Sequence, residues 1–514
     1  MNNFEYNLGQ RFQTIVLENK NKIALSFIDN TFISYSELEI LSNRIAHFLL
    51  SKKVQKGAVI AIFNDKTKET FATMLACIKI GVIYTNLDFN SPIERLKKMI
   101  TICQPTFIFS PIKYNGIIEK CEYSSINIIN YIPQIFDNYK SHFPSENQQV
   151  TGNMPAYIMF TSGSTGFPKG VVITHFNVLH FISWSKQTYN SNSEDIFTNI
   201  NPMHFDNAVF DFYASLFIGA SCIPIPEELT KHPRRLIDSI TKLKPTIWFS
   251  VPSMLIYMLK LRALKVTDIP SLRIVTFGGE GFPKNQFRNL WEIWGNKVQF
   301  INVYGPTECT CICSSYNVSS IDLPSDELLP LGPIAPNFGF YIADSNGRKV
   351  HDGETGELYL SGSNVGLGYY NNNEKTQEVF IQNPEITAFK DIVYKTGDLV
   401  KYSTKENLLY FCGRIDNQIK RMGYRIELEE IEQALGSLYY IEENAVIFIK
   451  MNDEAGKIIA CIRTSFQNEK KILDDLAAYL PAYMIPNEIR YFEHLPKNQN
   501  GKIDRLQLKE QFTV

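Results

Sequence analysis

The sequence predicts an α/β protein with a large N-terminal domain and a small α+β domain at its C-terminal end. With 514 residues and a mass of 59.0 kDa, the chain is too long for one compact core. Stretches with helical periodicity alternate with short apolar runs along most of its length, which favours parallel sheets covered by helices. Near Asp416 this alternation gives way to a polar, glycine-bearing segment, which marks a second domain.

The large domain is predicted from helix-like and strand-like segments that follow one another. Tyr35–Lys52 and Thr67–Ile80 have the spacing of amphipathic helices. Ala58–Phe63, Thr106–Phe109 and Thr246–Val251 are short apolar runs typical of buried strands. We therefore expect a multi-layered domain over residues 1–415, with mostly parallel sheets and helices.

The C-terminal segment has a different pattern. Gly413–Leu435 changes from a polar ribbon into an amphipathic helix, and strand-like Asn444–Lys450 and Ile458–Thr464 follow it. A helix-like stretch, Lys470–Leu480, comes next. We expect residues 416–514 to form a small α+β lid.

Composition and charge argue against several classes of protein. Hydrophobic residues make up 44% and charged residues 20% of the chain, as in ordinary globular proteins. A net charge of −2 does not suit a nucleic-acid binder that neutralises phosphates. The first residues, MNNFEYNLGQRF, lack the regions of a signal peptide, and no run of 18 apolar residues predicts a membrane span. We expect a cytoplasmic protein that does not bind a membrane.

The cysteines fit the same compartment. Nine in so long a chain suit a reducing cytoplasm with free thiols. Cys309, Cys311 and Cys313 alternate, so in a strand they would share one face, whereas metal-binding cysteines are usually farther apart. Packing within a strand is the default interpretation, and metal binding is the alternative.

The segment TSGSTGFPKG, Thr161–Gly170, places four hydroxyls, three glycines and a lysine in ten residues. Apolar runs at Ala156–Phe160 and Val171–Ile173 flank it, which predicts a strand–loop–strand unit. The loop is either a flexible surface hairpin or an anion cradle built from backbone N–H groups, hydroxyls and an ammonium. Because Pro168 precedes Lys169 and no hydroxyl follows it, this is not a Walker loop, and a metal ligand must come from elsewhere.

NVYGPTE, Asn302–Glu308, follows an apolar run at an expected strand end. A Gly-Pro pair alone often means only a turn. As part of a nucleotide site, Tyr304 would stack on a base, Thr307 would meet phosphate, and Glu308 would supply the hard oxygen ligand that Mg²⁺ prefers.

Three further segments have the residue types of such a site. GGEGFP (Gly278–Pro283) has glycines that permit close backbone approach to a base. YKTGDL carries Asp398, which can accept from two ribose hydroxyls. NQNGKIDR places Lys502 on a polar loop near the end of the sequence, where a lone lysine is ordinarily solvated surface.

Together and in this order, these segments resemble the adenylate-forming superfamily, most closely the amino-acid adenylation domains of nonribosomal peptide synthesis. The resemblance covers nearly the whole chain. Its motifs are ISYSEL (Ile33–Leu38), GVIYTNLDFNSPIERL (Gly81–Leu96), TSGSTGFPKG, FDNAVFD (Phe205–Asp211), NVYGPTE, GELYLSGSNVGLGYYN (Gly356–Asn371), YKTGDL, GRIDNQIKRMGYRIELEEIE (Gly413–Glu432) and LPKNQNGKIDR (Leu495–Arg505).

The resemblance implies an ATP-dependent ligase with two half-reactions. A substrate carboxylate attacks the α-phosphate of ATP, with Mg²⁺, and a phosphopantetheine thiol then takes the acyl group after the small domain swings. Lys502 would bridge the carboxylate and the phosphoryl oxygens, Lys169 would hold pyrophosphate, and Asp416 would be the hinge. The implied ATP-binding residues are Thr161, Ser162, Gly163, Ser164, Thr165, Gly166, Gly279, Glu280, Asn302, Tyr304, Gly305, Asp398 and Arg414, with Thr307 and Glu308 joining Lys502 and Lys169 in catalysis and Glu308 holding the metal.

The resemblance also implies a substrate pocket. Asp206 falls where amino-acid-activating members place the aspartate that pairs with the substrate ammonium, although a solvated loop aspartate is the alternative. The remaining pocket positions would be Asn207, Phe210, Ser250, Val275, Phe277, Val303, Cys311 and Ile312. They carry no charge, which favours a small, uncharged amino acid. TIWFSVPSM (Thr246–Met254) and VTFGGEGFP (Val275–Pro283) also look like D-alanine–carrier-protein ligases.

Two other functions compete with carrier loading. An acyl- or aryl-CoA ligase of the same superfamily normally lacks the aspartate found here at Asp206, and a nucleotide-binding regulator would not need the catalytic residues. The sequence contains no Gly-Gly-x-Ser carrier site and ends nine residues after Arg505. We therefore expect a monomeric domain, either free-standing or excised from a larger synthetase, whose acceptor is a separate peptidyl or acyl carrier protein.

Overall fold

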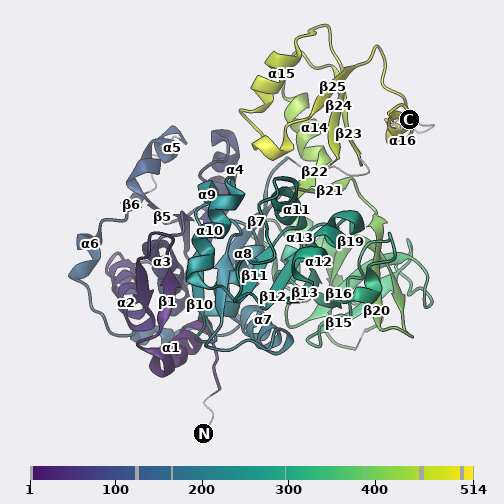
Figure 1. Ribbon diagram of the computed structural model, residues 1–514. Coiled ribbons are helices and arrows are strands. Elements are labelled where there is room, and N and C mark those ends of the chain that lie inside the picture. The colour runs from purple at the N-terminus through teal and green to yellow at the C-terminus, as the bar shows by residue number, and fades with distance from the viewer. Residues whose placement is uncertain are drawn as a thin grey trace.

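The computed structural model describes residues 4–121, 127–163, 166–295, 297–386, 388–450, 456–497 and 503–512. Figure 1 shows a large body, coloured purple to green, and a smaller C-terminal unit in yellow that meets it at strands β21 (Gln418–Arg421) and β22 (Tyr424–Glu427). The α/β architecture predicted from the sequence is confirmed. None of the helices in the described ranges has the length and apolar character needed to cross a bilayer.

The first large sheet carries the loop Thr161–Gly170 on its antiparallel pair. Five neighbouring strands, from β7 to the edge strand β6, run parallel to one another. β8 pairs antiparallel with β7, and β17 pairs antiparallel with β8. In spatial order the strands are β17 (Gly368–Tyr369), β8 (Lys169–Thr174), β7 (Pro155–Thr161), β4 (Ile83–Leu87), β3 (Val59–Phe63), β5 (Phe107–Ser110) and β6 (Asn127–Asn130).

The second large sheet contributes the ends of its central strands to the opposite wall of the candidate site. It is parallel except for one antiparallel strand at each edge. Its order is β14 (Ser314–Val318), β13 (Gln299–Tyr304), β12 (Ile274–Gly278), β11 (Ile247–Ser250), β9 (Ile196–Asn199), β10 (Ser221–Pro224), β1 (Ile23–Ser26) and β2 (Phe32–Ser34).

A third, antiparallel sheet completes the large domain and leads to the C-terminal unit. Its strands are β15 (Phe338–Ala343), β16 (Gly356–Gly362), β19 (Ile392–Ser403), β18 (Phe380–Gln382) and β20 (Leu408–Arg414), the last paired with β19. Because β20 ends at Arg414 and β21 begins at Gln418, the predicted hinge Asp416 falls between two strands.

Helices cover both faces of the two large sheets. The largest apolar core includes side chains of both large sheets and of α1, α2, α3, α7 and α8, while α10, α11 and α12 pack on the other face of the second sheet. The helices of the large domain are α1 (Leu8–Asn19), α2 (Tyr35–Ser51), α3 (Lys68–Ile80), α4 (Ile93–Cys103), α5 (Asn115–Lys120), α6 (Pro133–Asp137), α7 (His175–Thr188), α8 (Asn207–Leu216), α9 (Glu227–Thr230), α10 (Pro233–Leu243), α11 (Pro252–Lys260), α12 (Lys284–Trp294) and α13 (Asn373–Val379).

Local sequence signals explain where the predicted helices begin and end. Ser34 and Glu37 form a reciprocal capping box at the start of α2, which satisfies backbone N–H groups that have no partner within the helix. Thr67 caps α3, and Gly81 ends it with a left-handed φ of 69°, a conformation that costs glycine little.

The C-terminal unit has its own core. A hairpin of β21 and β22 leads into α14 (Leu428–Gly436), and a sheet of β23 (Glu443–Ile449), β24 (Lys457–Arg463) and β25 (Glu488–Tyr491) packs with α15 (Glu469–Leu476) and α16 (Arg505–Glu510). Its two apolar clusters contain only residues from Ile419 onward.

The expectation that the three alternating cysteines lie in a strand is wrong. Cys309 ends a 3₁₀ turn, and Thr310 and Cys311 have left-handed φ values of 60° and 74°. Two consecutive residues in that region cannot continue an extended strand, so β14 starts only at Ser314. Cys309, Cys311 and Cys313 are nevertheless buried in the main core.

Candidate active site

A cavity of about 90 Å³ lies where the large domain meets the β21–β22 hairpin. Its walls come from the end of β7, the start of α8, the end of β13 with the turn after it, and the third sheet. It is lined by Arg95, Met159, Phe160, Thr161, Ser162, Phe205, Asp206, Asn207, Phe249, Gly279, Val303, Tyr304, Gly305, Pro306, Thr307, Cys311, Ile312, Thr396, Asp398, Arg414, Gln418, Lys420, Gly423, Arg425 and Tyr483.

The hydroxyl-rich loop forms one wall of the cavity. Thr161 ends β7 and Lys169 begins β8, so the predicted strand–loop–strand unit is confirmed. The Thr161 hydroxyl is buried without a hydrogen-bond partner, and the N–H of Gly163 donates to a carboxylate oxygen of Glu430 at 3.4 Å. Gly166 has a left-handed φ of 68°. The predicted residues Ser164 and Thr165 lie outside the described residues.

Glu308 is fully buried behind the cavity wall. One carboxylate oxygen accepts from the Tyr369 hydroxyl at 2.7 Å, and the other accepts from the Arg425 guanidinium at 2.7 Å. Burial alone would raise the pKa of Glu308, but the charges of Arg425 and Lys169 outweigh burial and lower that pKa to about 2. The carboxylate is therefore ionised and suited to a cation.

Lys169 is buried next to the same carboxylate. Its ammonium lies 3.3 Å from a carboxylate oxygen of Glu427 and 5.4 Å from the centre of the Tyr369 ring. Burial lowers its pKa, and the charge of Arg425 adds to that effect while Glu427 opposes it. The structure thus brings Lys169 and Glu308 to one end of the site, as a Mg²⁺-pyrophosphate group would require.

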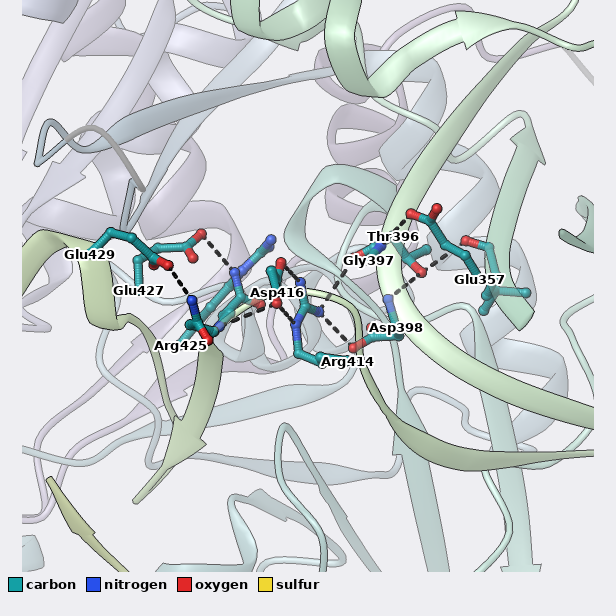
Figure 2. A network of polar contacts seen from close by, with 12 residues as sticks. Glu357, Thr396, Gly397, Asp398, Arg414, Asp416, Arg425, Glu427 and Glu429 are labelled. Carbon is teal, nitrogen blue, oxygen red and sulfur yellow. Dashed lines mark hydrogen bonds and ion pairs between the residues drawn. The ribbon is translucent and has the colours of Figure 1, made fainter. Parts of the chain in front are cut away.

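The predicted ribose residues meet at the edge of the third sheet. Figure 2 shows Arg414 between Asp398 and Asp416, with the side chains of both carboxylates turned toward it. Arg414 donates to Asp398 at 2.6 Å and to Asp416 at 2.5 Å, and the Tyr304 hydroxyl donates to the other oxygen of Asp398 at 2.6 Å. This network holds Asp398 in the cavity wall and ties it to the predicted hinge.

Asp206 and Thr307 lie together in the cavity wall. Asp206 precedes α8, and its carboxylate accepts from the Thr307 hydroxyl at 2.6 Å. Burial raises the pKa of Asp206 more than the Thr307 hydrogen bond lowers it. Among the described residues, no cation lies within ion-pair distance of this carboxylate, so a ligand ammonium would supply the charge that it lacks.

The remaining predicted ATP residues are divided between cavity and framework. Gly279, which has a φ of 90°, and Gly305 line the cavity. Glu280 bridges two elements instead, because its oxygens accept from the N–H groups of Ser253 and Gly423. Asn302 is buried and donates to the carbonyl of Pro330 at 2.8 Å, away from the cavity lining.

The predicted substrate positions also separate into two groups. Asn207, Val303, Cys311 and Ile312 line the cavity. The other four are packed in the apolar cores or next to them, and they are Phe210, Ser250, Val275 and Phe277.

Strand alternation explains three of these four positions, whereas Phe210 lies on α8 and packs in the main core. On β11, Phe249 faces the cavity, while its neighbour Ser250 turns away and accepts from Trp248 at 2.8 Å. Val275 and Phe277 on β12 turn to the same far face, where Phe277 packs on Phe282 and Phe287. Because side chains alternate along a strand, a shift of one residue exchanges the two faces.

Several cavity residues were not predicted from the sequence. Arg425 and Lys420 come from the β21–β22 hairpin, and Arg95 comes from α4. Tyr369 on β17, outside the cavity lining, donates to Glu308 and was not predicted either. Lys420 and Arg425 lie in the motif Gly413–Glu432, where the cluster of charges after Asp416 could have pointed to them. Arg95 lies in the motif Gly81–Leu96, and nothing in its spacing distinguishes it from the other residues of that motif.

The residues present fit a magnesium nucleotide. The Gly163 N–H already donates to a carboxylate oxygen of Glu430, and the buried Thr161 hydroxyl has no hydrogen-bond partner, so the loop can bind further anionic oxygens. No group of three metal-ligating side chains occurs within the described ranges. This suits Mg²⁺, which binds through one or two carboxylates together with substrate phosphates and water, and Glu308 would be the protein ligand.

Fold and site define an ATP-dependent, AMP-forming ligase with a large and a small unit around one nucleotide site. The chain belongs to the AMP-binding enzyme family, whose match spans residues 12–370. It is 31% identical over 490 residues to a D-alanine–D-alanyl carrier protein ligase of Bacillus licheniformis, covering 94% of this chain and 95% of that protein. A ligase of the same name from Bacillus mycoides is 30% identical over 489 residues, with the same coverage.

Solved structures share the fold. The adenylation domain AlmE of Vibrio cholerae, in complex with glycyl-adenosine-5'-phosphate, superposes with a TM-score of 0.84 at 23% identity, covering 100% of this chain and 99% of that one. An artificially fused adenylation–carrier di-domain from Klebsiella oxytoca, NpsA-ThdA, gives a TM-score of 0.80 at 23% identity, covering 95% and 94% of the two chains.

Proposed function

We propose that the protein activates a small, uncharged amino acid as its aminoacyl adenylate and transfers it to the phosphopantetheine thiol of a separate carrier protein. The observation that carries this proposal is Asp206, a carboxylate in the cavity wall that lacks a cationic partner among the described residues. The positive charge of an α-ammonium placed against Asp206 would offset the effect of burial, which raises the pKa of this carboxylate.

Adenylation needs no nucleophile from the protein, because the substrate carboxylate attacks the α-phosphorus and pyrophosphate leaves. The chain's contribution is to position the reactants and to stabilise charge. We assign Asp398 and Arg414 to the ribose, Tyr304 to the base, and Lys169 and the hydroxyl-rich loop to the phosphates. When bound at Glu308, Mg²⁺ would neutralise charge on the phosphate oxygens.

Lys502 completes this first half-reaction in our proposal. It lies outside the described residues, so its role is carried over from the family motif in which it stands. We propose that it bridges the substrate carboxylate and the phosphoryl oxygens, and that rotation about Asp416 brings it to the site and takes it away. The division into residues 1–415 and 416–514 follows from that hinge.

In the second half-reaction, the carrier thiol attacks the acyl carbon and AMP leaves. The position of the β21–β22 hairpin supports a role for it here, since Lys420, Gly423 and Arg425 line the cavity. We propose that this arrangement corresponds to the transfer state. A monomer in the cytoplasm would meet both ATP and a phosphopantetheine-bearing carrier protein.

The cavity favours a small substrate side chain. Met159, Phe249, Val303 and Ile312 give it apolar walls. Of the cationic lining residues, Arg95, Arg414 and Arg425 are each engaged in an ion pair, and the ammonium of Lys420 lies 5.2 Å from the centre of the Tyr304 ring. The relatives named as D-alanine ligases make D-alanine the first candidate, followed by other small amino acids. An acyl- or aryl-CoA ligase is the second candidate function, but its substrate would carry no ammonium to pair with Asp206.

An ATP–pyrophosphate exchange panel tests this proposal. The panel should contain D- and L-alanine, glycine, serine, threonine, cysteine, valine, the larger and charged amino acids, and the deaminated acid of each small one. We expect exchange with one or a few small amino acids and little with their deaminated analogues. Exchange driven by aryl or fatty acids, but by no amino acid, would favour the CoA-ligase function.

A further inference from the structure

The loop between β9 and α8 leads to the carboxylate that we assign to the substrate ammonium. It covers residues 200–206, and its last two residues, Phe205 and Asp206, line the cavity. The side chain of Asp206 makes no capping hydrogen bond to the start of α8. Its position therefore depends on its contact with Thr307 and on what holds the rest of the loop.

Two side chains of the first large sheet hold this loop from its buried side. The ammonium of Lys66, just after β3, donates to the carbonyls of Asn199 and Ile200 at 2.8 and 3.2 Å. The side-chain amide of Asn86, on β4, donates to the carbonyl of Met203 at 3.0 Å. The two large sheets are thus connected through the backbone of the loop.

A buried carboxylate on α8 completes the network. Asp211 is fully buried, and one of its oxygens accepts from the side-chain amides of Asn199 and Asn201 at 3.1 and 3.0 Å. The Asn201 amide also donates to the carbonyl of Phe249, the cavity residue of β11, at 3.0 Å. Asn199 joins a cation to a carboxylate, since its carbonyl accepts from Lys66 and its side chain donates to Asp211.

Burial of these two charges is unfavourable for stability. Lys66 is 6% exposed, and its φ of 65° lies in the left-handed region that residues other than glycine seldom adopt. Burial lowers the pKa of Lys66, and the charge of Asp211 opposes that shift. Burial raises the pKa of Asp211 against the hydrogen bonds from Asn201 and Asn199. Because apolar side chains are often as stable in such places, a role in setting geometry accounts for these charges better than a role in stability.

We propose that Lys66 and Asp211 are positioning residues that fix the β9–α8 loop, so that the carboxylate of Asp206 faces the substrate ammonium. This inference rests on the proposed function, in which Asp206 pairs with that ammonium. Neither Lys66 nor Asp211 lines the cavity, so both act through the loop, and no bond is made or broken at either. Removing one of them leaves the other charge buried without its counter-charge.

Steady-state pyrophosphate exchange by the full chain supplies the first test, in Lys66→Met and Asp211→Asn. We expect KM for the best amino acid to rise at least about tenfold while KM for ATP stays within about twofold, because a displaced loop moves Asp206 and not the ATP residues. Discrimination between the amino acid and its deaminated analogue should fall by the same factor. Equal changes in both KM values, or unchanged discrimination, would overturn the positioning role.

Lys79→Met is the matched control. Lys79 is also a fully buried lysine of the large domain, but it pairs with Glu39 between α3 and α2, and neither residue lines the cavity. Its loss should lower thermal stability and leave substrate discrimination unchanged. Loss of discrimination equal to that of Lys66→Met would show that general destabilisation suffices, and the proposal would fail.

The double variant Lys66→Met, Asp211→Asn tests whether the two residues act as one network. It leaves neither charge unpaired, so its loss of discrimination should not exceed the larger of the two single losses. Losses that add together would contradict a shared network. Thermal unfolding shows whether each variant is folded, and Asp211→Asn, which keeps the size of the side chain, decides the question if Lys66→Met does not fold.

Amide hydrogen exchange gives a readout that needs no substrate. Amides of residues 199–211 should exchange at least about tenfold faster in Lys66→Met than in the unmodified protein or in Lys79→Met. Unchanged protection of these amides would overturn the proposal even if activity falls. If no amino acid supports pyrophosphate exchange in the unmodified protein, the proposed function fails, while amide protection still decides whether Lys66 and Asp211 fix the loop.

Discussion

Substitution of Asp206 by alanine should abolish the preference for an amine-bearing substrate. Losing one partner of a buried ion pair typically costs about 3–5 kcal/mol. Asp206 lies in the wall of a cavity and is only half-buried, so the lower end, about 3 kcal/mol, is the appropriate figure. That corresponds to roughly two powers of ten in kcat/KM.

The assay compares each amino acid with its deaminated analogue by pyrophosphate exchange. For the best amino acid, kcat/KM should fall about a hundredfold in Asp206→Ala, whereas the analogue, such as propionate for alanine, should change little or improve. Asp206→Asn preserves the size of the side chain and should behave like Asp206→Ala. If amino acid and analogue lose activity equally, Asp206 is structural and the reasoning is refuted.

Three further predictions concern a catalytic residue, a metal ligand and a buried histidine. Lys502→Ala should greatly reduce adenylation measured by pyrophosphate exchange, while transfer from a supplied adenylate persists; near-normal exchange would remove Lys502 from the mechanism. Glu308→Gln should lower exchange activity, and added Mg²⁺ should restore part of it because an amide binds a hard cation less well; an unchanged metal dependence would require another ligand. The buried His175 ring accepts from the Leu8 N–H at 3.2 Å, and burial lowers its pKa to about 3. Below about pH 6.5 this histidine binds a proton in the unfolded chain but not in the native protein. The free energy of unfolding should therefore fall by about 1.4 kcal/mol per pH unit from there toward pH 3. Denaturant unfolding from pH 7 to 5 should show a shallower slope in His175→Gln and an unchanged one in His180→Gln, which alters an exposed histidine of the same helix; equal slopes in both variants would contradict this assignment.

Features encoded locally could be predicted from the sequence. The strands on either side of the hydroxyl-rich loop follow from apolar runs at Ala156–Phe160 and Val171–Ile173, and the helix after Thr67 follows from its cap and periodicity. Asp398 and Arg414 were expected at one site, and antiparallel pairing of β19 with β20 places them opposite each other.

Contacts between distant segments could not be predicted in the same way. Arg425 and Glu308 are separated by 117 residues, and Arg95 and Glu430 by 335, so their pairing depends on how the two domains meet. The sequence pattern also could not predict which face of a strand each side chain occupies. Every residue of β11 is buried, so burial does not distinguish Phe249, which lines the cavity, from its neighbours on that strand.

Loading of a carrier protein tests the central claim most directly. A phosphopantetheine-bearing carrier protein would be incubated with the enzyme, ATP, Mg²⁺ and the amino acid that gives the strongest exchange, and its intact mass would be measured. The account predicts a gain of one aminoacyl group on the carrier, released by hydroxylamine as a thioester should be, and no gain without ATP. Acylation of free coenzyme A with no gain on any carrier would contradict the account.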